Sequence, residues 1–252
     1  MTSSRSRPTP PPTPRPSAPD AAPATRGRAS RADIHQSIYD AIVEHRLLPG
    51  TKLSEERVAE LFAVSRTQVR GALQRLAVEQ LVTLIPNRGA FVTTPSAEEA
   101  HDVLSVRRTL EPAAVTRLIE RIATGKAPTA VRQLRALVRR EQQAHARGER
   151  RQAVRLSGDF HVLLAELSGS SILARLMREL TPLTCLAILT FEAPTAVACP
   201  NDEHALLIDA IERGDTEGAA RLMTEHLTHI EKALNLDAQE VREVDLAEVL
   251  FG

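Results

Sequence analysis

The sequence predicts a mainly α-helical protein, in which an N-terminal winged helix-turn-helix of three helices and a β-hairpin is followed by an all-α antiparallel helical bundle. Three observations support this fold class. Residues 32–95 hold three segments of helical periodicity, then a strand, a turn and a second strand. Residues 96–236 show only the helical period, with no other convincing strand pair. The length of 252 residues suits two modest domains or one large domain.

Local signals place the elements of the first domain. Isoleucines at four-residue spacing mark one face of a first helix: Ile34, Ile38 and Ile42. Ser54 is positioned to cap a second helix. Three apolar residues are expected to form the buried face of that helix: Val58, Leu61 and Phe62. Ser65 and Gln68 have the spacing of a capping box, which begins a third helix. Residues 81–85 and 90–94 are predicted to be the two strands of the hairpin.

The second domain is expected to be a bundle of about six helices. Glycine and proline interrupt the helical period and divide it into segments. These segments are 97–124, 128–148, 150–168, 171–192, 201–213 and 216–236. Such short connections are typical of antiparallel neighbours.

Composition excludes several classes of protein. Hydrophobic residues form 42% of the chain and charged residues 25%, as in soluble globular proteins. Aromatic residues form only 2%, too few for a platform that stacks single-stranded nucleic acid. No apolar run approaches the roughly 18 residues of a membrane span, so no membrane partner is expected. Cys185 and Cys199 have no metal-type spacing, and we expect packing residues in a reducing, cytoplasmic compartment.

The two ends of the chain differ from its middle. Residues 1–31 hold six Arg against one Asp, and residues 1–30 hold eight of the sixteen prolines. Because such a composition buries little apolar surface, we predict a disordered arm. The arm is interpreted as a solvated tail, as a nonspecific contact to DNA phosphates or as a transit peptide, although its prolines disfavour the last. Residues 237–252 are predicted to be an acidic tail, either loose or a short packed helix.

The third helix carries the candidate DNA-binding residues. A helix-turn-helix reads double-stranded DNA with the first turn of its second helix. Four residues of that turn are candidates: Arg66, Thr67, Gln68 and Arg70. Arg88 and Gly89 at the tip of the hairpin are positioned to reach the neighbouring minor groove. The residue types alone are equally consistent with arginines that lie in solvent on an exposed helix and do not contact DNA.

The stretch 47–92 resembles the DNA-binding domain of the GntR family of bacterial transcription regulators nearly end to end. The matching motifs are Pro49-Gly50, Leu53-Ser54-Glu55, Val64-Ser65-Arg66, Val69-Arg70, Ala72-Leu73, Leu76 and Arg88-Gly89-Ala90. Gln68 stands where the family usually has Pro, Gly71 where it has Glu, and Gln80 where it has Gly. The resemblance implies a homodimer on a short palindromic operator in double-stranded DNA, usually a repressor that its effector releases.

Three histidines lie on apolar faces of different predicted helices: His161, His204 and His226. Bundle cores build metal sites from side chains on facing helices, and neutral imidazole suits zinc or nickel. The residues therefore indicate a candidate divalent-metal site, for which His229 is a substitute ligand or a supporting residue. The alternative is that each is a core histidine with an ordinary hydrogen-bond partner.

Two further stretches, DFHVLLAELSGSSIL and DEHALLIDAIERGDTEGAARLMTEHLTHIE, resemble the FCD ligand-binding domain of the FadR-like branch. The resemblance implies that His161, His204 and His226 bind a divalent metal that helps to hold a small carboxylate effector. The family's fourth ligand is an Asp at the position of Ser157, and Asp159 is expected to point away from His161.

Arg107 is the candidate effector-binding residue of the first bundle helix. The resemblance favours a guanidinium that faces the cavity and pairs with an effector carboxylate. The alternative is a surface pair with Glu111, four residues along the same helix.

Three functions are therefore considered. The first is a transcription regulator whose operator affinity depends on a small organic acid bound in the bundle. The second is a metal-dependent hydrolase that uses the three-histidine site, but no His-Glu-x-x-His spacing or nucleophile motif accompanies it, so no catalytic residue is expected. The third is a DNA-binding protein whose bundle only dimerises.

Overall fold

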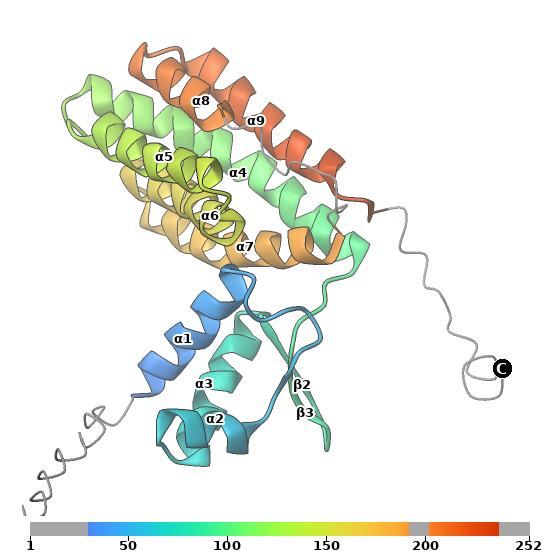
Figure 1. Ribbon diagram of the computed structural model, residues 1–252. Coiled ribbons are helices and arrows are strands. Elements are labelled where there is room, and N and C mark those ends of the chain that lie inside the picture. Colours follow the sequence, from blue (N-terminus) through green and yellow to red (C-terminus); the bar gives the residue numbers. More distant parts are fainter. Residues whose placement is uncertain (1–29, 192–201, 237–252) are drawn as a thin grey trace, which may run out of the picture.

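The computed structural model describes residues 30–191 and 202–236. The elements within these ranges are α1 (Arg31–Val43), β1 (Lys52–Leu53), α2 (Glu55–Phe62), α3 (Arg66–Val78), β2 (Val82–Ile85), β3 (Gly89–Val92), α4 (Ala97–Ala123), α5 (Ala130–Ala146), α6 (Arg150–Leu167), α7 (Ser171–Phe191), α8 (Glu203–Glu212) and α9 (Thr216–Ala233). Figure 1 shows two lobes, with α1 to β3 in one and α4 to α9 in the other. The predicted arm, the predicted acidic tail and Cys199 lie outside the described residues.

The helices of the N-terminal lobe begin at capping serines. The Ser54 hydroxyl accepts a hydrogen bond from the backbone N–H of Arg57, and α2 follows. Ser65 and Gln68 form a capping box before α3, in which the Gln68 amide oxygen accepts from the Ser65 backbone at 3.3 Å. Both predictions from the sequence are confirmed. Ala63 ends α2 in the left-handed region with φ of 53°, and so makes the tight turn between α2 and α3.

A small antiparallel sheet completes this lobe. Its strand order is β1-β3-β2, and Val82 of β2 lies opposite Val92 of β3. The sequence predicted the β2–β3 hairpin but not β1, because two residues are too short to show alternation. The predicted buried face of α2 was partly wrong: Leu61 is 64% exposed and Ala59 is the buried residue.

The helices α4 to α9 form the bundle that the sequence predicted. Here α4 packs along α9, α5 packs against α6 and α8, and α6 packs against α7. Their buried faces share one apolar core that includes Leu104, Leu134, Phe160 and Leu227. No helix among the described residues is both long and apolar enough to cross a bilayer. Three buried histidines interrupt the apolar core.

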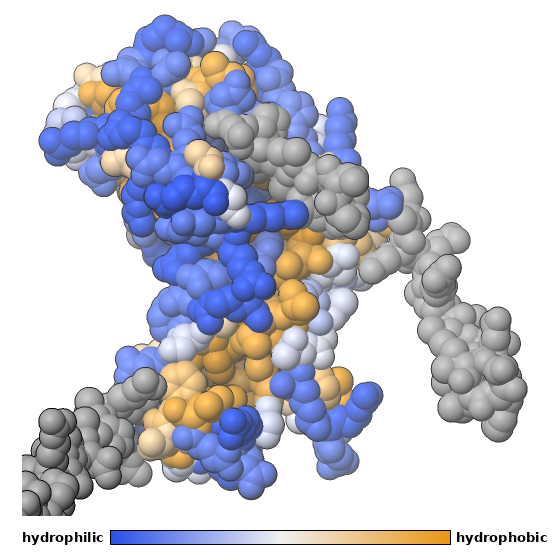
Figure 2. All heavy atoms as spheres, in the orientation of Figure 1, coloured by the Kyte–Doolittle hydropathy of each residue, from blue (hydrophilic) through white to orange (hydrophobic). Residues whose placement is uncertain are grey.

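The two lobes meet where α1 packs against α7. Leu186 of α7 is 1% exposed and belongs to the apolar core of the N-terminal lobe rather than to that of the bundle. In Figure 2, apolar surface gathers over the N-terminal lobe and this junction, whereas the visible face of the bundle is mainly hydrophilic. One bundle helix is therefore part of both lobes.

Candidate functional site

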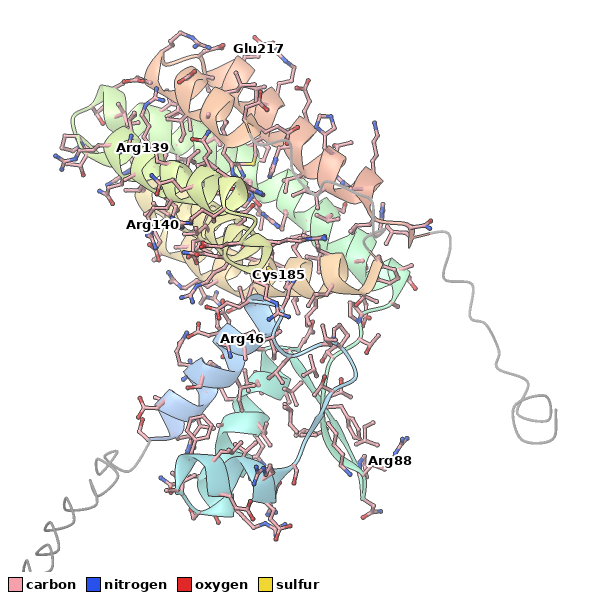
Figure 3. All side chains as sticks on the ribbon, viewed as in Figure 1. Arg46, Arg88, Arg139, Arg140, Cys185 and Glu217 are labelled. Carbon is pink, nitrogen blue, oxygen red and sulfur yellow. The ribbon has the colours of Figure 1, made fainter. Side chains whose placement is uncertain are left out.

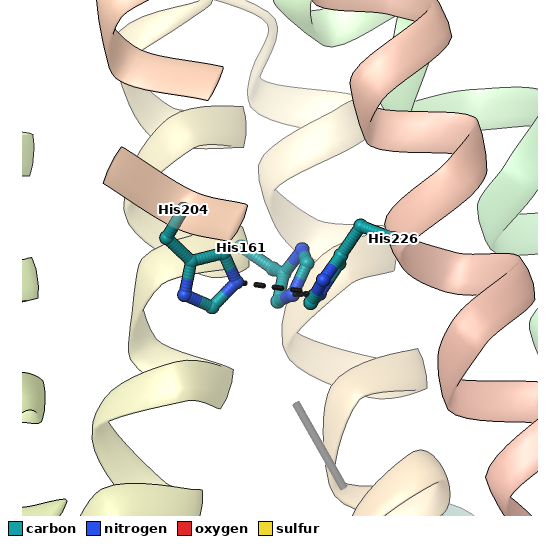
Figure 4. Close-up of side chains that lie close together, drawn as sticks. All are labelled: His161, His204 and His226. Atoms are coloured by element: carbon teal, nitrogen blue, oxygen red, sulfur yellow. Dashed lines mark hydrogen bonds between the residues drawn. The ribbon is translucent and has the colours of Figure 1, made fainter. Parts of the chain in front are cut away.

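The structure brings together three histidines that are far apart in the sequence. They come from α6, α8 and α9, and their rings turn towards one another (Figure 4). His161, His204 and His226 are 1%, 5% and 2% exposed. The Nε2 atom of His226 lies 3.2 Å from that of His161 and 3.3 Å from that of His204. The sequence placed all three on apolar faces, and the fold makes them one cluster.

A glutamate contacts the outer side of each ring. The three Nδ1 atoms have different partners: Glu111 for His161 at 2.5 Å, Glu141 for His204 at 2.9 Å and Glu203 for His226 at 2.7 Å. A carboxylate only accepts hydrogen bonds, so each Nδ1 donates its proton and each Nε2 keeps a lone pair. His229 contacts the other oxygen of Glu203 at 2.5 Å and is half-exposed, so it lies outside the cluster.

This donor set fits a divalent cation. The Nε2 atoms of His161 and His204 lie 3.2 and 3.3 Å from that of His226, and lone pairs this close repel one another unless a positive charge lies between them. An ion bound tetrahedrally through bonds of about 2.0–2.1 Å needs nitrogen ligands about 3.3 Å apart. The two separations from His226 match that requirement, and all three ligand atoms lie within 4.8 Å of one another. His161, His204 and His226 could therefore hold a metal, and the FCD-like ligand set implied by the sequence fits the geometry.

Burial keeps two rings of the cluster, His161 and His226, neutral at physiological pH. It lowers the pKa of His161 to about 4 and that of His226 to about 3, because a charged ring loses its hydration inside the bundle. Burial alone would raise the pKa of Glu111, but the charge of Arg107 and hydrogen bonds from Arg107 and His161 lower it to about 2. These two rings are thus available as lone-pair donors, and Glu111 is ionised.

A cavity of about 220 Å³ borders the cluster. Its lining includes Arg107, Ser157, His161, Thr181, Thr184 and Cys185. Arg107 is 1% exposed and donates from Nε to Glu111 at 2.6 Å and from Nη1 to Thr184 at 3.0 Å. Its Nη2 and the hydroxyl of Thr181 have no hydrogen-bond partner among the described residues. Arg107 does pair with Glu111, but the pair is buried at the cavity rather than at the surface.

Ser157, at the position of the family's fourth ligand, and Asp159, two residues later, lie on different sides of α6. Ser157 lines the cavity, whereas the side chain of Asp159 is 53% exposed and lies 3.9 Å from Arg155. Gly158 allows α6 to approach α7 closely, because a Cβ there would lie 2.9 Å from Thr181 Cγ2. Cys185 is buried as a packing residue, and burial raises the pKa of its thiol to about 12.

The candidate DNA-binding residues lie on one exposed edge of the N-terminal lobe. Arg66, Thr67 and Arg70 are exposed, while Val69 between them is fully buried. Arg70 donates two hydrogen bonds to Glu55 of α2, at 2.9 and 2.8 Å. Glu55 therefore fixes the direction of the guanidinium in the free protein, as a fork-to-fork pair does.

The hairpin carries a further exposed arginine. Arg88 projects from the tip of the β2–β3 hairpin (Figure 3), and its guanidinium carbon lies 5.9 Å from the centre of the Phe91 ring. Gly89 follows with φ of +100°, a conformation that L side chains rarely adopt. The turn thus requires a glycine at this position, and the glycine lets the tip bend sharply while Arg88 stays exposed.

Two family models match the chain. Residues 30–92 match the model described as bacterial regulatory proteins, gntR family, and residues 102–229, just over half of the chain, match the FCD domain. The chain belongs to the GntR family and carries an FCD domain. Both resemblances found in the sequence are therefore confirmed. This GntR-family chain is a DNA-binding transcription regulator.

Curated relatives and solved structures agree with this assignment. The HTH-type transcriptional repressor RspR of Escherichia coli (strain K12) is 26% identical over 212 residues, which cover 82% of this chain and 91% of the relative. LutR, an HTH-type transcriptional regulator of Bacillus subtilis (strain 168), is 28% identical over 207 residues, which cover 75% of this chain and 94% of the relative. A GntR regulator from Rhodococcus sp. RHA1 superposes with a TM-score of 0.71 and 25% identity, over 80% of this chain and 95% of that chain. The relatives carry the names of regulators, not of enzymes.

The sequence did not reveal the glutamates that contact the histidine rings. Glu141 follows Leu134, Leu137 and Val138 at helical spacing, so it lies on the buried face of α5. A carboxylate on an apolar stripe was the available signal, since a buried charge needs a partner. Glu111 was considered only as a surface partner of Arg107. Spacing within one helix cannot reveal a partner on another helix.

Proposed function

We propose that this GntR-family regulator binds a palindromic operator as a homodimer, and that a small carboxylate held in the bundle cavity sets its DNA affinity. As is usual in the family, the protein acts as a repressor, and binding of the acid releases it from the operator. The single observation that carries the effector site is the pair of unpartnered polar atoms at the cavity, Arg107 Nη2 and Thr181 Oγ1.

The cavity chemistry supports a carboxylate. Arg107 keeps one N–H group for a ligand after its bonds to Glu111 and Thr184, and Thr181 offers a hydroxyl on α7. Leaving two such atoms without a partner costs free energy that a bound anion would recover. A cavity of about 220 Å³ has room for a small organic acid and not for a large cofactor.

A divalent cation is part of this proposal, with His161, His204 and His226 as its ligands and zinc or nickel as the candidates. When bound, the ion supplies a positive charge next to the cavity, which attracts a carboxylate oxygen. Ser157 adds no charge there, so the cation keeps an open position that faces the acid.

The DNA side of the proposal rests on α3 and the hairpin. Arg66, Thr67, Gln68 and Arg70 on the first turn of α3 would enter the major groove, and Arg88 and Gly89 would approach the minor groove. In a homodimer, two such units match two half-sites of a palindrome.

The contacts between the lobes offer a route from the cavity to the DNA-binding edge. Thr181 and Thr184 of α7 face the cavity, while Leu186 of the same helix packs in the core of the N-terminal lobe. Arg155 of α6 pairs with Glu44 beyond the end of α1. An acid that binds more tightly to one arrangement of α6 and α7 would therefore favour the matching arrangement of the N-terminal lobe. The free energy of this shift is at most the difference in the acid's binding free energy between the two arrangements.

A fluorescence-anisotropy titration tests this proposal. Full-length protein is titrated onto a duplex of its own promoter and onto a scrambled duplex at one fixed salt concentration, because salt alone changes DNA affinity. A panel of small organic acids is screened by thermal shift, and those that bind are added to the titration. We expect preference for the promoter and a fall in affinity with at least one acid.

Arg107→Met provides the matched variant for the effector. It should keep promoter binding and lose the response to the acid, since Arg107 lies in the bundle cavity and α3 belongs to the N-terminal lobe. If no acid changes DNA affinity in the parent protein, the bundle has only a dimerising role and the effector proposal is wrong. Turnover of any acid in the presence of zinc or nickel would instead favour an enzyme.

A further inference from the structure

Three glutamates surround the histidine cluster, and none belongs to the ligand set implied by the family resemblance. We propose that Glu111, Glu141 and Glu203 form a carboxylate shell that orients the three imidazoles towards a divalent cation and supplies the negative charge that Ser157 does not. This inference rests on the metal site of the proposed function and deepens it, because it assigns the positioning residues of that site.

The geometry repeats three times. Each glutamate comes from a different helix, α4, α5 or α8, and each contacts the Nδ1 atom of one ring at 2.5 to 2.9 Å. Such a contact fixes the tautomer and the rotation of the ring, and it makes Nε2 a better electron donor. All three Nε2 atoms then point into the same space. Three independent contacts with the same result are what a preorganised cation site requires.

Two of the glutamates are themselves held at both oxygens. Glu111 accepts from His161 with Oε2 and from Arg107 with Oε1 at 2.6 Å. Glu203 contacts His226 with Oε2 and His229 with Oε1. A carboxylate fixed at both oxygens cannot swing away, so the ring it contacts keeps its direction. His229, which the sequence suggested as a supporting residue, acts through Glu203.

Charge gives a second argument. Three imidazoles and the hydroxyl of Ser157 supply lone pairs to a divalent cation but no negative charge, and the site is buried, so water screens the charge of the ion only weakly. The three glutamates contribute three negative charges, and Arg107 and Arg150 at the cavity contribute two positive charges, so the surroundings carry a formal charge of minus one. That charge offsets part of the charge of a divalent ion. An aspartate in place of Ser157 would have provided part of it directly.

Metal affinity tests the inference. Full-length protein, freed of metal with a chelator, competes with a chromophoric chelator for Ni²⁺ and for Zn²⁺. Glu203→Gln, Glu141→Gln and Glu111→Gln each keep an oxygen acceptor and remove one charge. Each should weaken metal binding by about 10–100-fold. The matched control is Glu231→Gln: Glu231 contacts Nδ1 of the exposed His101 at 2.7 Å, away from the cluster, and its loss should leave metal affinity unchanged.

A second measurement separates positioning from loss of fold. Ser157→Asp restores a carboxylate beside the cation, and combined with Glu203→Gln it should recover at least 10-fold in metal affinity. Simple misfolding would not respond to this change. The visible absorption bands of bound Co²⁺ should also shift in Glu203→Gln, because the donor strength of His226 changes. Glu203 is 16% exposed, so its variant remains usable if Glu111→Gln does not fold.

The outcomes distinguish the inference from the proposed function. His161→Ala should abolish metal binding in any case. If the parent protein binds metal and His161→Ala does not, while the three glutamine variants bind as tightly as the parent, the carboxylate shell is wrong and the metal site stands. If the parent protein binds neither ion, the metal site and the shell are both wrong.

Discussion

Arg107 and Glu111 lie one turn apart on α4 and pair inside the bundle, with 2.6 Å between Nε and Oε1. Both side chains are almost completely buried, at 2% and 1% exposure. Glu111 also contacts His161, so one carboxylate joins the cavity arginine to the histidine cluster. A charged pair at this depth depends on both partners, because either charge alone would be buried without compensation.

The first prediction concerns this pair. Arg107→Met or Glu111→Gln should each lower the free energy of unfolding by about 3 kcal/mol or more in metal-free protein, since each leaves a buried partner unsatisfied. The double variant should lose less than the sum of the single losses, by roughly 1–3 kcal/mol. Urea denaturation monitored by circular dichroism measures all three values.

The control for this prediction has the same spacing on the surface. Arg175 and Glu179 are also four residues apart, but their side chains are 63% and 48% exposed. Arg175→Met should cost less than about 1 kcal/mol. Strictly additive losses at Arg107 and Glu111 would show that the two residues do not interact.

The second prediction concerns DNA reading. Arg70→Ala should weaken promoter binding by about 1–3 kcal/mol, because it removes a guanidinium that can contact a base edge with two donors. The affinity for a scrambled duplex should change much less. Arg75→Ala on the same helix is the control, since Arg75 pairs with Glu79 in the last turn of α3. Equal affinity of the parent and Arg70→Ala at fixed salt would remove Arg70 from the reading face.

The third prediction concerns pH. Burial lowers the pKa of His161 to about 4 and that of His226 to about 3, so both histidines bind protons more readily in the unfolded chain. Between about pH 6.5 and the folded values, the unfolded state therefore holds more protons, and stability falls as pH falls. From pH 7 to pH 5 we expect a loss of roughly 2 kcal/mol for each of the two. His45, whose pKa burial lowers to about 4, adds to the loss.

Urea denaturation between pH 7 and pH 5, with a chelator present, measures this loss. His226→Gln removes one titrating ring, so its stability should depend less steeply on pH over the same window. A stability that stays level from pH 7 to pH 5 would contradict the assignment of these rings as neutral and buried.

The fourth prediction concerns Gly71 in the interior of α3. Glycine there lowers helix stability, and Gly71→Ala should raise the free energy of unfolding by about 0.5–1 kcal/mol. A Cβ at this position would lie 2.9 Å from Nε of Arg31, which is the far end of a flexible side chain and can move. Thermal and urea unfolding measure the change. A loss of stability would mean that Arg31 is fixed against the helix and needs the space.

The sequence predicted the fold well because its signals are local. Capping serines, glycine breaks and apolar periods act within a few residues, so the bundle segments and the hairpin could be placed before the structure. Leu61 was misplaced because the apolar period of a short helix does not distinguish a core face from an exposed one. The two residues of β1 depend on pairing with β3, in which Leu53 lies opposite Ala90, 37 residues further along the chain.

The sequence likewise predicted some residues of the candidate site and not others. The histidines could be found because a polar ring on an apolar stripe is unusual, and three such helices in one bundle have to meet in its core. Their glutamate partners could not be found, because Glu111 and Glu141 lie on helices other than those of the rings they contact. The contact between Arg155 and Glu44 was equally hidden, since it joins the two lobes.

That contact carries the last prediction. Arg155 of α6 reaches across the junction to Glu44 and lies 3.8 Å from Asp40 of α1, while Ser157 two residues along borders the cavity. If α6 transmits the state of the cavity to α1, Arg155→Gln should leave acid binding unchanged by thermal shift and reduce the effect of the acid on promoter affinity by about fivefold or more. Anisotropy titrations with and without an acid identified in the screen measure that effect.

Arg135→Gln is the matched control for this prediction. Arg135 pairs with Asp209 and Glu212 within the bundle, so its loss should leave the response to the acid intact. An unchanged response in Arg155→Gln would place the coupling in α7 and its contact through Leu186 instead.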